Sequence, residues 1–265
     1  MRKELRKNKI VPYVLTFNEE DNIASILNDL KDFEEVLVID SFSTDKTEEI
    51  VNQFTNAKFI QNEFISHSAQ HKFATALCSS ADWCIRLDAD WRIPAAALHE
   101  IINKIESPEI NAISVGFDFA IHGNLTSVGL YGPVTCIFRP DNVDILQDGH
   151  TERIVTTGNK VSLGTKFIHD DRKPLSRFFR SQERYSILEL KKHSENKKTK
   201  NRRLRNRVKS TIRQYPILSL LILISLLSIL KLGALKGDAA RHYIFQRVMA
   251  ETFFQLRALD RNLRK

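Results

Sequence analysis

The first half of the chain alternates between short apolar runs and longer segments whose apolar residues have helical spacing. The apolar runs, which predict strands, are Ile10–Thr16, Val36–Asp40, Lys58–Gln61 and Trp83–Asp88. The helical patterns lie between and after them, at Glu19–Leu30, Asp45–Phe54, Ala69–Cys78 and Ala95–Ile105. Strands separated by helices of this length predict an α/β fold in which helices cover both faces of a mostly parallel sheet.

The pattern changes twice further along the chain. From Ala112 to about Lys166, short strands alternate with glycine-containing turns, which we expect to complete the sheet and line a pocket. Lys191–Lys209 then carries ten basic residues and one acidic residue, whereas Ile217–Leu230 carries no charge. A mixed pattern at Ala239–Leu259 predicts a final helix. We therefore expect an α/β domain at residues 1–190 and a helical region at residues 191–265.

Composition narrows the class of protein. The 265 residues are 42% apolar, which supports a sizeable core, and the formal charge of +8 favours an anionic partner such as nucleic acid, anionic lipid or a phosphorylated substrate. The three cysteines, Cys78, Cys84 and Cys136, form no Cys-x-x-Cys pair, so they indicate neither a disulfide framework nor a zinc site. The charged segment Met1–Ile10 is not typical of a secretory signal.

Acidic residues lie where two of the predicted strands end. Asp88 and Asp90 close one strand, and Asp40 closes another. Ligands of open α/β sheets bind beyond the carboxyl ends of the strands, where carboxylates hold hard cations or accept hydrogen bonds from a base or ribose. Taken singly, each motif is also compatible with a solvated turn or a helix-capping turn. The sequence has no Gly-x-Gly-x-x-Gly or P-loop motif, which argues against dehydrogenases and P-loop NTPases.

Three segments follow one another in a set order. They are Thr16-Phe17-Asn18-Glu19-Glu20, then Val38-Ile39-Asp40-Ser41-Phe42-Ser43-Thr44-Asp45-Lys46-Thr47, then Leu87-Asp88-Ala89-Asp90. Together they resemble the signatures of family 2 glycosyltransferases, which have the GT-A fold. The resemblance is strongest over Lys9–Asp90 and extends to about Leu190. Within the family, the chain is most similar to bacterial enzymes that add a sugar to the lipopolysaccharide core, such as the core β-1,4-glucosyltransferases.

The resemblance implies that the chain is an inverting glycosyltransferase that uses a nucleotide-sugar, usually a UDP-sugar. The residues expected around the nucleotide are Thr16, Phe17, Glu20, Asp40, Gln70, Lys72 and Asp88. Phe17 stands where the family more often has tyrosine, so the ring is kept and the hydroxyl is lost. Asp40 would recognise the base and Asp88 the ribose. Gln70 and Lys72 would face the nucleotide or its phosphates, or else form the polar face of a surface helix.

The resemblance also implies a divalent cation, Mg²⁺ or Mn²⁺, on the donor diphosphate. Asp90 would be the main ligand, with Asp88 beside it. His169 would approach the metal or the phosphates, although a single histidine is more often structural or exposed. When bound, the cation would neutralise the negative charge that builds on the leaving diphosphate.

An inverting transfer further requires a carboxylate that removes the proton of the acceptor hydroxyl. The segment Asp148-Gly149-His150-Thr151-Glu152-Arg153 supplies two candidates, and we expect Glu152 rather than Asp148 to be this base. The alternative is a solvated loop in which Glu152 pairs with Arg153.

The last third of the sequence predicts contact with a membrane. A basic segment beside an uncharged one favours an anionic membrane surface, and no nucleic-acid-binding motif accompanies the basic run. The apolar run, extended to Leu235, is short for a transmembrane helix, so we expect a peripheral or monotopic attachment through residues 191–235. Burial within the protein or in a dimer interface is the alternative. The expected location is the cytoplasmic face of the inner membrane, next to a lipid-linked glycan acceptor.

Other classes fit the sequence less well. A polyprenyl-phosphate sugar synthase shares the donor chemistry but often has longer or multiple spanning helices. A sugar nucleotidyltransferase would carry a glycine-rich, arginine-containing loop after its first strand, where this chain has Thr16-Phe17-Asn18-Glu19-Glu20. A non-catalytic basic adaptor would not need carboxylates at successive strand ends.

Overall fold

The computed structural model describes residues 9–126, 128–148, 151–198, 215–225 and 237–264. Two compact units divide the chain: a sheet-containing unit up to residue 172, and a mainly helical unit that contains residues 173–265 and the short stretches 124–128 and 148–150. The expected boundary after residue 190 stays a prediction.

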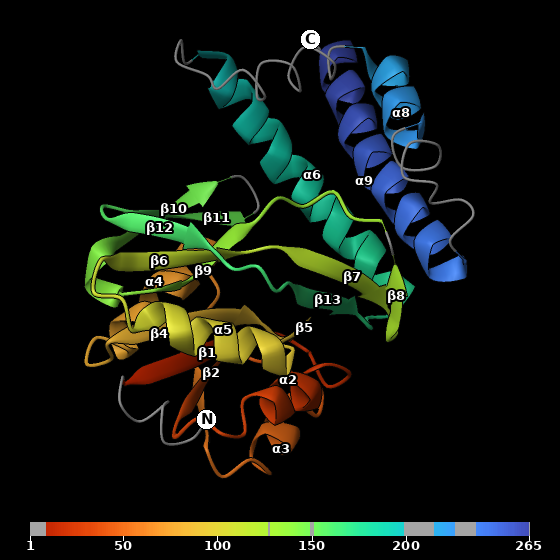
Figure 1. Cartoon of the computed structure of the whole chain (residues 1–265). Helices are drawn as coiled ribbons and strands as arrows, with labels where there is room; N and C mark the ends of the chain where they lie inside the picture. Colours follow the sequence, from red (N-terminus) through yellow and green to blue (C-terminus); the bar gives the residue numbers. More distant parts are fainter. Residues whose placement is uncertain (1–8, 127, 149–150, 199–214, 226–236, 265) are drawn as a thin grey trace. The chain divides into compact units, whose positions relative to one another are not determined.

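The sheet-containing unit is built on a seven-stranded sheet in the order β12-β6-β9-β4-β1-β2-β3 (Figure 1). Strand β9 is antiparallel to its neighbours β4 and β6, and the other neighbouring strands are parallel. The seven strands are β1 (Ile10–Thr16), β2 (Val36–Asp40), β3 (Ala57–Gln61), β4 (Trp83–Asp88), β6 (Ile110–Val115), β9 (Val134–Phe138) and β12 (Asn159–Ser162).

Alternate residues of the strands point to two separate cores. On one face, Val14, Val38 and Leu87 pack with helices α2 (Ile23–Asp29), α3 (Thr47–Val51) and α5 (Ala95–Ile105). On the other face, Tyr13 and Ile39 pack with helix α4 (His67–Leu77) and with strands β10 (Val143–Asp148) and β11 (Thr151–Thr156). This arrangement confirms the predicted α/β fold with helices on both faces of a mostly parallel sheet. A 3₁₀ turn, η1, covers Pro140–Asn142.

A smaller sheet follows the end of β4. Strand β13 (Phe167–Asp171) pairs antiparallel with β5 (Trp91–Arg92) and parallel with β7 (Phe117–Ile121). The carboxylate of Asp29, at the end of α2, accepts from Arg92 Nε at 2.7 Å, from Arg92 Nη2 at 2.9 Å and from the Ile93 amide at 2.9 Å. These bonds fix the segment that follows Asp90.

The first helix begins later than its sequence pattern predicts. Asn18 has a φ of 54° and its Oδ1 accepts from the Thr44 amide at 2.7 Å, so it belongs to a loop–loop contact and not to the first turn of a helix. Helix α2 therefore begins at Ile23 instead of Glu19. Helix α4 begins two residues earlier than predicted, because Ser66 Oγ caps it by accepting from the Ala69 amide at 3.1 Å.

The helical unit contains α6 (Leu175–Lys198), α8 (Pro216–Ile224), α9 (Asp238–Leu263) and the short strand β8 (Asn124–Thr126). Helix α9 packs against α6, α8 and β8. Ser219 Oγ accepts from Gln255 Nε2 at 3.0 Å, and Ser186 Oγ accepts from Arg257 Nε at 2.9 Å, which ties α8 and α6 to α9. Within the described ranges, no helix is both long and apolar enough to cross a bilayer. Residues 199–214 and 226–235 of the predicted membrane-associating segment 191–235 lie outside those ranges.

Candidate functional site

The carboxyl ends of three adjacent parallel strands bring the predicted polar residues to one edge of the large sheet. In the order β4-β1-β2, Asp88 lies opposite Leu15, and Thr16 lies opposite Asp40. Asp90 follows two residues after Asp88. The structure therefore gathers Thr16, Asp40 and Asp88 at the edge where open α/β sheets bind their ligands.

Asp40 is fully buried and held by its own loop. Its Oδ1 accepts from Thr16 Oγ1 at 3.0 Å and from Ser43 Oγ at 2.5 Å, and its Oδ2 accepts from the Ser43 amide at 2.8 Å. Three donors hold this carboxylate in a single orientation, which is what selective recognition of a ligand group requires.

Gln70 supports that loop from helix α4. Its side chain is 1% exposed; Nε2 donates to Ser41 Oγ at 3.2 Å, and Oε1 accepts from Asn62 Nδ2 at 2.7 Å. Gln70 thus braces the loop that follows Asp40.

The other predicted nucleotide residues are more exposed. Phe17 is 46% exposed beside the β1 end. Glu20 Oε2 accepts from the Lys46 amide at 3.2 Å. Lys72 Nζ lies 3.9 Å from Asp144 Oδ1, and both side chains are more than half exposed, which fits the alternative of a polar helix face. Their roles in nucleotide binding stay predictions.

Two residues of the predicted metal set approach each other closely. His169 lies on β13, and its Nε2 is 3.6 Å from Oδ1 of the buried Asp90. The backbone holds the pair together, because the Asp170 amide donates to the Asp90 carbonyl oxygen at 2.8 Å. Asp88, the third residue of the set, is paired with Arg86 instead, and its Oδ2 is 3.7 Å from Arg86 Nη2.

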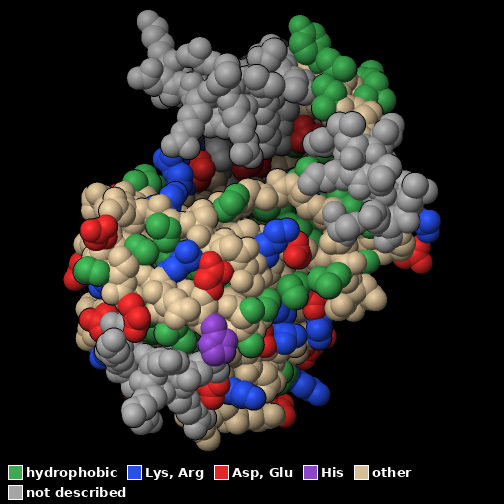
Figure 2. Space-filling model, viewed as in Figure 1, with side chains coloured by type: hydrophobic (Ala, Val, Ile, Leu, Met, Phe, Trp, Pro, Cys, Tyr) green, Lys and Arg blue, Asp and Glu red, His purple; other side chains and the backbone are tan. Residues whose placement is uncertain are grey.

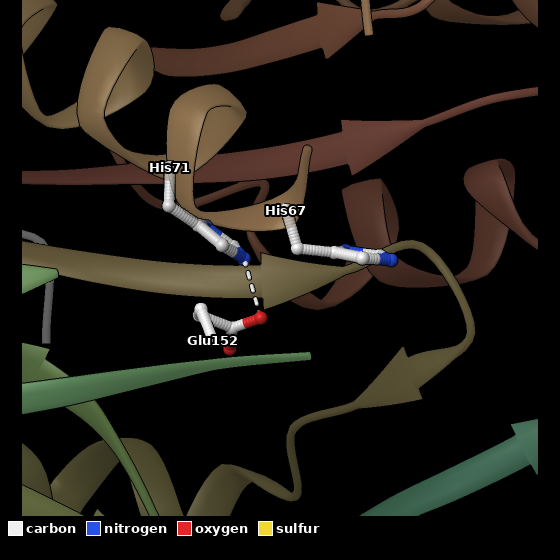
Figure 3. A group of neighbouring side chains, drawn as sticks. All are labelled: His67, His71 and Glu152. Carbon is white, nitrogen blue, oxygen red and sulfur yellow. Dashed lines mark ion pairs between the residues drawn. The ribbon is translucent and has the colours of Figure 1, made fainter. Parts of the chain in front are cut away.

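A buried polar group that includes the predicted base lies next to Asp88. Glu152 is only 6% exposed, and its Oε1 is 2.7 Å from Arg86 Nη2. Its Oε2 is 3.6 Å from His71 Nε2, and His71 Nδ1 is 3.3 Å from the Tyr13 hydroxyl (Figure 3). Glu152 is therefore a buried residue paired with Arg86, not part of a solvated loop paired with Arg153. Asp148, the other candidate base, ends β10 and is half-buried.

Burial and neighbouring charges determine the protonation of this group. Desolvation raises the pKa of Asp88 to about 6 even though 39% of its side chain is exposed; Arg86 opposes the rise, and Asp90 and Glu152 add to it. Burial disfavours the charge on Arg86, but Glu152 and Asp88 outweigh it and raise the Arg86 pKa. Burial lowers the pKa of His71 well below its ordinary value, and Arg86 adds to this effect, so the ring is neutral at pH 7.

Sequence patterns did not single out Arg86 or His71. Arg86 had a detectable signal: it is a charged residue within an apolar strand, and its spacing of two from Asp88 places both on the same face. His71 had no comparable signal, because its partners Tyr13 and Glu152 are distant in sequence. The guanidinium of Arg86 also lies over the Trp91 ring, 5.0 Å from its centre.

A sequence model described as Glycosyl transferase family 2 matches residues 13–161, which are more than half of the chain. The chain belongs to glycosyl transferase family 2. The matched segment runs from β1 to β12 and includes Asp40, Asp88, Asp90 and Glu152.

Curated relatives of this family 2 chain carry glycosyltransferase names. An uncharacterized glycosyltransferase of Rickettsia bellii is 34% identical over 99 residues, which are 37% of this chain and 33% of the relative. The lipopolysaccharide core biosynthesis glycosyltransferase LpsC of Rhizobium meliloti is 29% identical over 138 residues, 49% of this chain and 46% of the relative. The matches thus span a third to a half of the relatives' length.

Similar solved structures include S. aureus TarS 1-349 and the glucosyl-3-phosphoglycerate synthase from Mycobacterium tuberculosis in complex with Mn²⁺, UDP and glucosyl-3-phosphoglycerate. The first has a TM-score of 0.48 at 15% identity and covers 93% of this chain and 89% of its own. The second has a TM-score of 0.46 at 14% identity, and the match covers 72% of this chain and 82% of the synthase.

The buried Arg86–Glu152 pair of this family 2 chain should contribute to the free energy of unfolding. Arg86→Met and Glu152→Gln should each lower the free energy of unfolding by about 3–5 kcal/mol, because each leaves a buried polar partner uncompensated. The double variant should lose clearly less than the two single losses together. Urea unfolding measures all three.

The control is Lys166→Met, which removes an exposed ion pair with Asp118 at the same distance of 2.7 Å. Its cost should be about 0–1 kcal/mol. If Arg86→Met costs no more than Lys166→Met, the buried pair is not a significant source of stability.

Proposed function

We propose that the chain transfers a sugar from a UDP-sugar to a hydroxyl of a lipopolysaccharide-core or other lipid-linked glycan, with inversion at the anomeric carbon. The observation that carries the proposal is the placement of Asp40 at the end of β2 and of Asp88 and Asp90 at and just after the end of β4, on either side of β1, in a chain of glycosyl transferase family 2. The name of the LpsC relative supports the lipopolysaccharide-core acceptor.

In this proposal, Asp40 recognises the base of the nucleotide. Its carboxylate is fixed by Thr16 and Ser43, so it does not lose side-chain freedom when a base binds. Gln70 keeps the neighbouring loop in place, and Phe17 offers an exposed ring on which a base can stack. Asp88 binds the ribose.

Asp90, His169 and Asp88 would hold a divalent cation, Mg²⁺ or Mn²⁺. Carboxylate oxygens are the ligands these ions prefer, and the distance of 3.6 Å between Asp90 Oδ1 and His169 Nε2 is close to the spacing of two ligands of one ion. Bound there, the cation would stabilise negative charge on the leaving diphosphate. The chain itself holds β13 beside Asp90, through the backbone hydrogen bond from the Asp170 amide to the Asp90 carbonyl oxygen.

Glu152 is the proposed general base. Arg86 orients its carboxylate through Oε1, and the second oxygen faces His71. In an inverting transfer, Glu152 would take the proton from the acceptor hydroxyl while that oxygen forms a bond to the anomeric carbon and the bond to the diphosphate breaks. No covalent intermediate with the protein is needed.

We further propose that α8 attaches the protein to the cytoplasmic face of the inner membrane, as a peripheral or monotopic contact. Apolar side chains of α8 are exposed, including Ile217 at 76%, and Figure 2 shows apolar side chains over α8. The basic residues of Lys191–Lys209 precede α8 in the sequence and would favour an anionic lipid surface. Such an attachment would place the enzyme beside a lipid-linked acceptor.

Donor binding tests the proposed nucleotide site. UDP with Mn²⁺ at 100 times its dissociation constant should stabilise the protein by about 2.7 kcal/mol, visible as a higher melting temperature, whereas GDP, CDP and ADP should have smaller effects. Asp90→Asn should abolish the dependence on Mn²⁺, and Asp40→Asn should reduce the preference for UDP.

Asp118→Asn, an exposed carboxylate on β7, is the control and should behave like the unaltered protein. A protein that no nucleotide stabilises, or an Asp90→Asn variant with unchanged Mn²⁺ dependence, would contradict the proposed donor site.

The general base is tested by comparing Glu152→Gln with Asp148→Asn. Glu152→Gln should lower kcat by about 10²- to 10⁴-fold, because the amide cannot accept the proton, while UDP binding confirms that the variant is folded. Transfer of labelled glucose from UDP-glucose to lipopolysaccharide core measures the rate. A large loss in Asp148→Asn with little loss in Glu152→Gln would reassign the base to Asp148.

Membrane attachment is tested by flotation with vesicles of phosphatidylglycerol and phosphatidylethanolamine. The protein should float with these vesicles, less so at high salt, and much less with neutral phosphatidylcholine vesicles, because salt screens the basic residues. Ile217→Ser combined with Leu221→Ser should weaken flotation. Ile65→Ser, at an 80% exposed position of the sheet-containing unit, should not. Equal flotation of all three proteins would exclude α8 as the contact.

A further inference from the structure

Two histidines on one helix lie close to the proposed base, Glu152, which is on a neighbouring strand. His67 and His71 are four residues apart on α4, so they project from the same side of the helix, and Glu152 faces His71 from β11 (Figure 3). One ligand-type atom of each residue lies within 4.8 Å of the other two. Among the described residues, this is the one such group of three histidine, cysteine, aspartate or glutamate side chains.

The spacing between His71 and Glu152 does not match a direct hydrogen bond. Nε2 and Oε2 are 3.6 Å apart, which is too long, and the buried Nε2 has no hydrogen-bond partner among the described residues. Buried polar atoms usually have a hydrogen-bond or metal partner, so this nitrogen is available for one. Two ligands of a tetrahedral ion with bonds of about 2.0–2.1 Å lie about 3.3 Å apart, close to the observed separation.

The residues around His71 and Glu152 orient the two side chains so that Nε2 and Oε2 face each other. The Tyr13 hydroxyl is 3.3 Å from His71 Nδ1, so it can accept the proton of that nitrogen and leave the Nε2 lone pair directed at Glu152. Arg86 pairs with Oε1 of Glu152, which leaves Oε2 for a second partner. Burial keeps His71 neutral, the form that binds metals.

We propose that His67, His71 and Glu152 form a binding site for a borderline divalent transition metal, with Zn²⁺ as the preferred ion. Two imidazoles and one carboxylate are a ligand set that Zn²⁺ accepts, with a fourth position open to water. The ligand atoms of the three residues lie within 4.8 Å of one another, and those of a tetrahedral site lie about 3.3 Å apart. The half-buried His67 ring therefore has to move closer by at most about 1.5 Å to complete the site. This site shares no residue with the Asp88, Asp90 and His169 set, whose two carboxylates suit Mg²⁺ or Mn²⁺.

Arg86 sets the strength of the site. Its positive charge repels a cation on Glu152, while Asp88, 3.7 Å from the guanidinium, offsets part of that charge. The ion also takes up the oxygen of Glu152 that faces away from Arg86. Where Glu152 is the general base, as proposed above, Zn²⁺ would therefore inhibit transfer, but its binding does not depend on that role.

Cobalt substitution tests the site. The full chain without a histidine tag, freed of metals and carrying His169→Ala to remove the other histidine–carboxylate pair, is titrated with Co²⁺. One equivalent should produce the intense visible absorption of tetrahedral cobalt, and Zn²⁺, but not excess Mg²⁺, should abolish it. His67→Ala should weaken Co²⁺ binding at least tenfold, and Tyr13→Phe by about 10- to 100-fold through loss of the group that orients His71.

His99→Ala, at an exposed position on α5, is the matched control and should bind Co²⁺ as tightly as the parent protein. Melting curves without metal show whether each variant is folded, and Tyr13→Phe provides a second test that leaves the three ligands in place. Only weak absorption typical of octahedral cobalt, or equal Co²⁺ affinity in His67→Ala and His99→Ala, would overturn the proposal.

Discussion

The buried charge of Arg86 is the constraint on which the arrangement of the site depends. A guanidinium in the middle of an apolar strand costs several kcal/mol to desolvate, so the fold has to surround it with compensating groups. Glu152 is brought to it from β11, Asp88 lies two residues further on the same face, and the Trp91 ring lies beneath it. The need to compensate the buried guanidinium thus accounts for the position of Glu152, and β11 carries Glu152 to that position over the large sheet.

The same edge of the sheet also concentrates negative charge, and each carboxylate is accommodated differently. Asp40 is held by hydroxyl and amide donors, and Asp88 has a raised pKa beside Arg86. Asp90 lies against the imidazole of His169. In the absence of a cation, this clustering costs free energy, since like charges close together repel. A ligand that brings positive charge would remove that cost, which supports the proposed cation site at this edge.

Apolar patterns were sufficient to predict β1, β2, β3 and β4, and therefore the carboxylates at the ends of β2 and β4. The bounds of β1, β2 and β4 agree with their sequence runs, because each run is buried on both faces and ends where polar residues begin. The start of α2 could not be predicted, because the left-handed conformation of Asn18 depends on a contact with Thr44, which is distant in sequence. The contacts among Tyr13, His71 and Glu152 likewise depend on how three separate elements pack.

The pairing of Glu152 with Arg86 is a further contact that the sequence could not predict. A loop would have allowed Glu152 to pair with the adjacent Arg153, but residues 151–156 form a strand, in which neighbouring side chains point to opposite faces. Glu152 and Ile154 face the sheet, whereas Arg153 is exposed. Once the strand is formed, Glu152 pairs with Arg86.

Arg86 makes the two histidine–carboxylate pairs interdependent. It contacts Glu152, which faces His71, and Asp88, which neighbours Asp90 and His169. In a low-dielectric environment, a charge added at one carboxylate changes the free energy of ionisation of the other, because both interact with the same guanidinium. A cation on Glu152 would compete with Arg86 for that carboxylate and leave the guanidinium to interact more strongly with Asp88. Protonation of Asp88 would have the opposite effect and strengthen the pairing of Arg86 with Glu152. Asp88, Asp90 and Glu152 therefore form one electrostatic unit, even though Glu152 comes from a different strand.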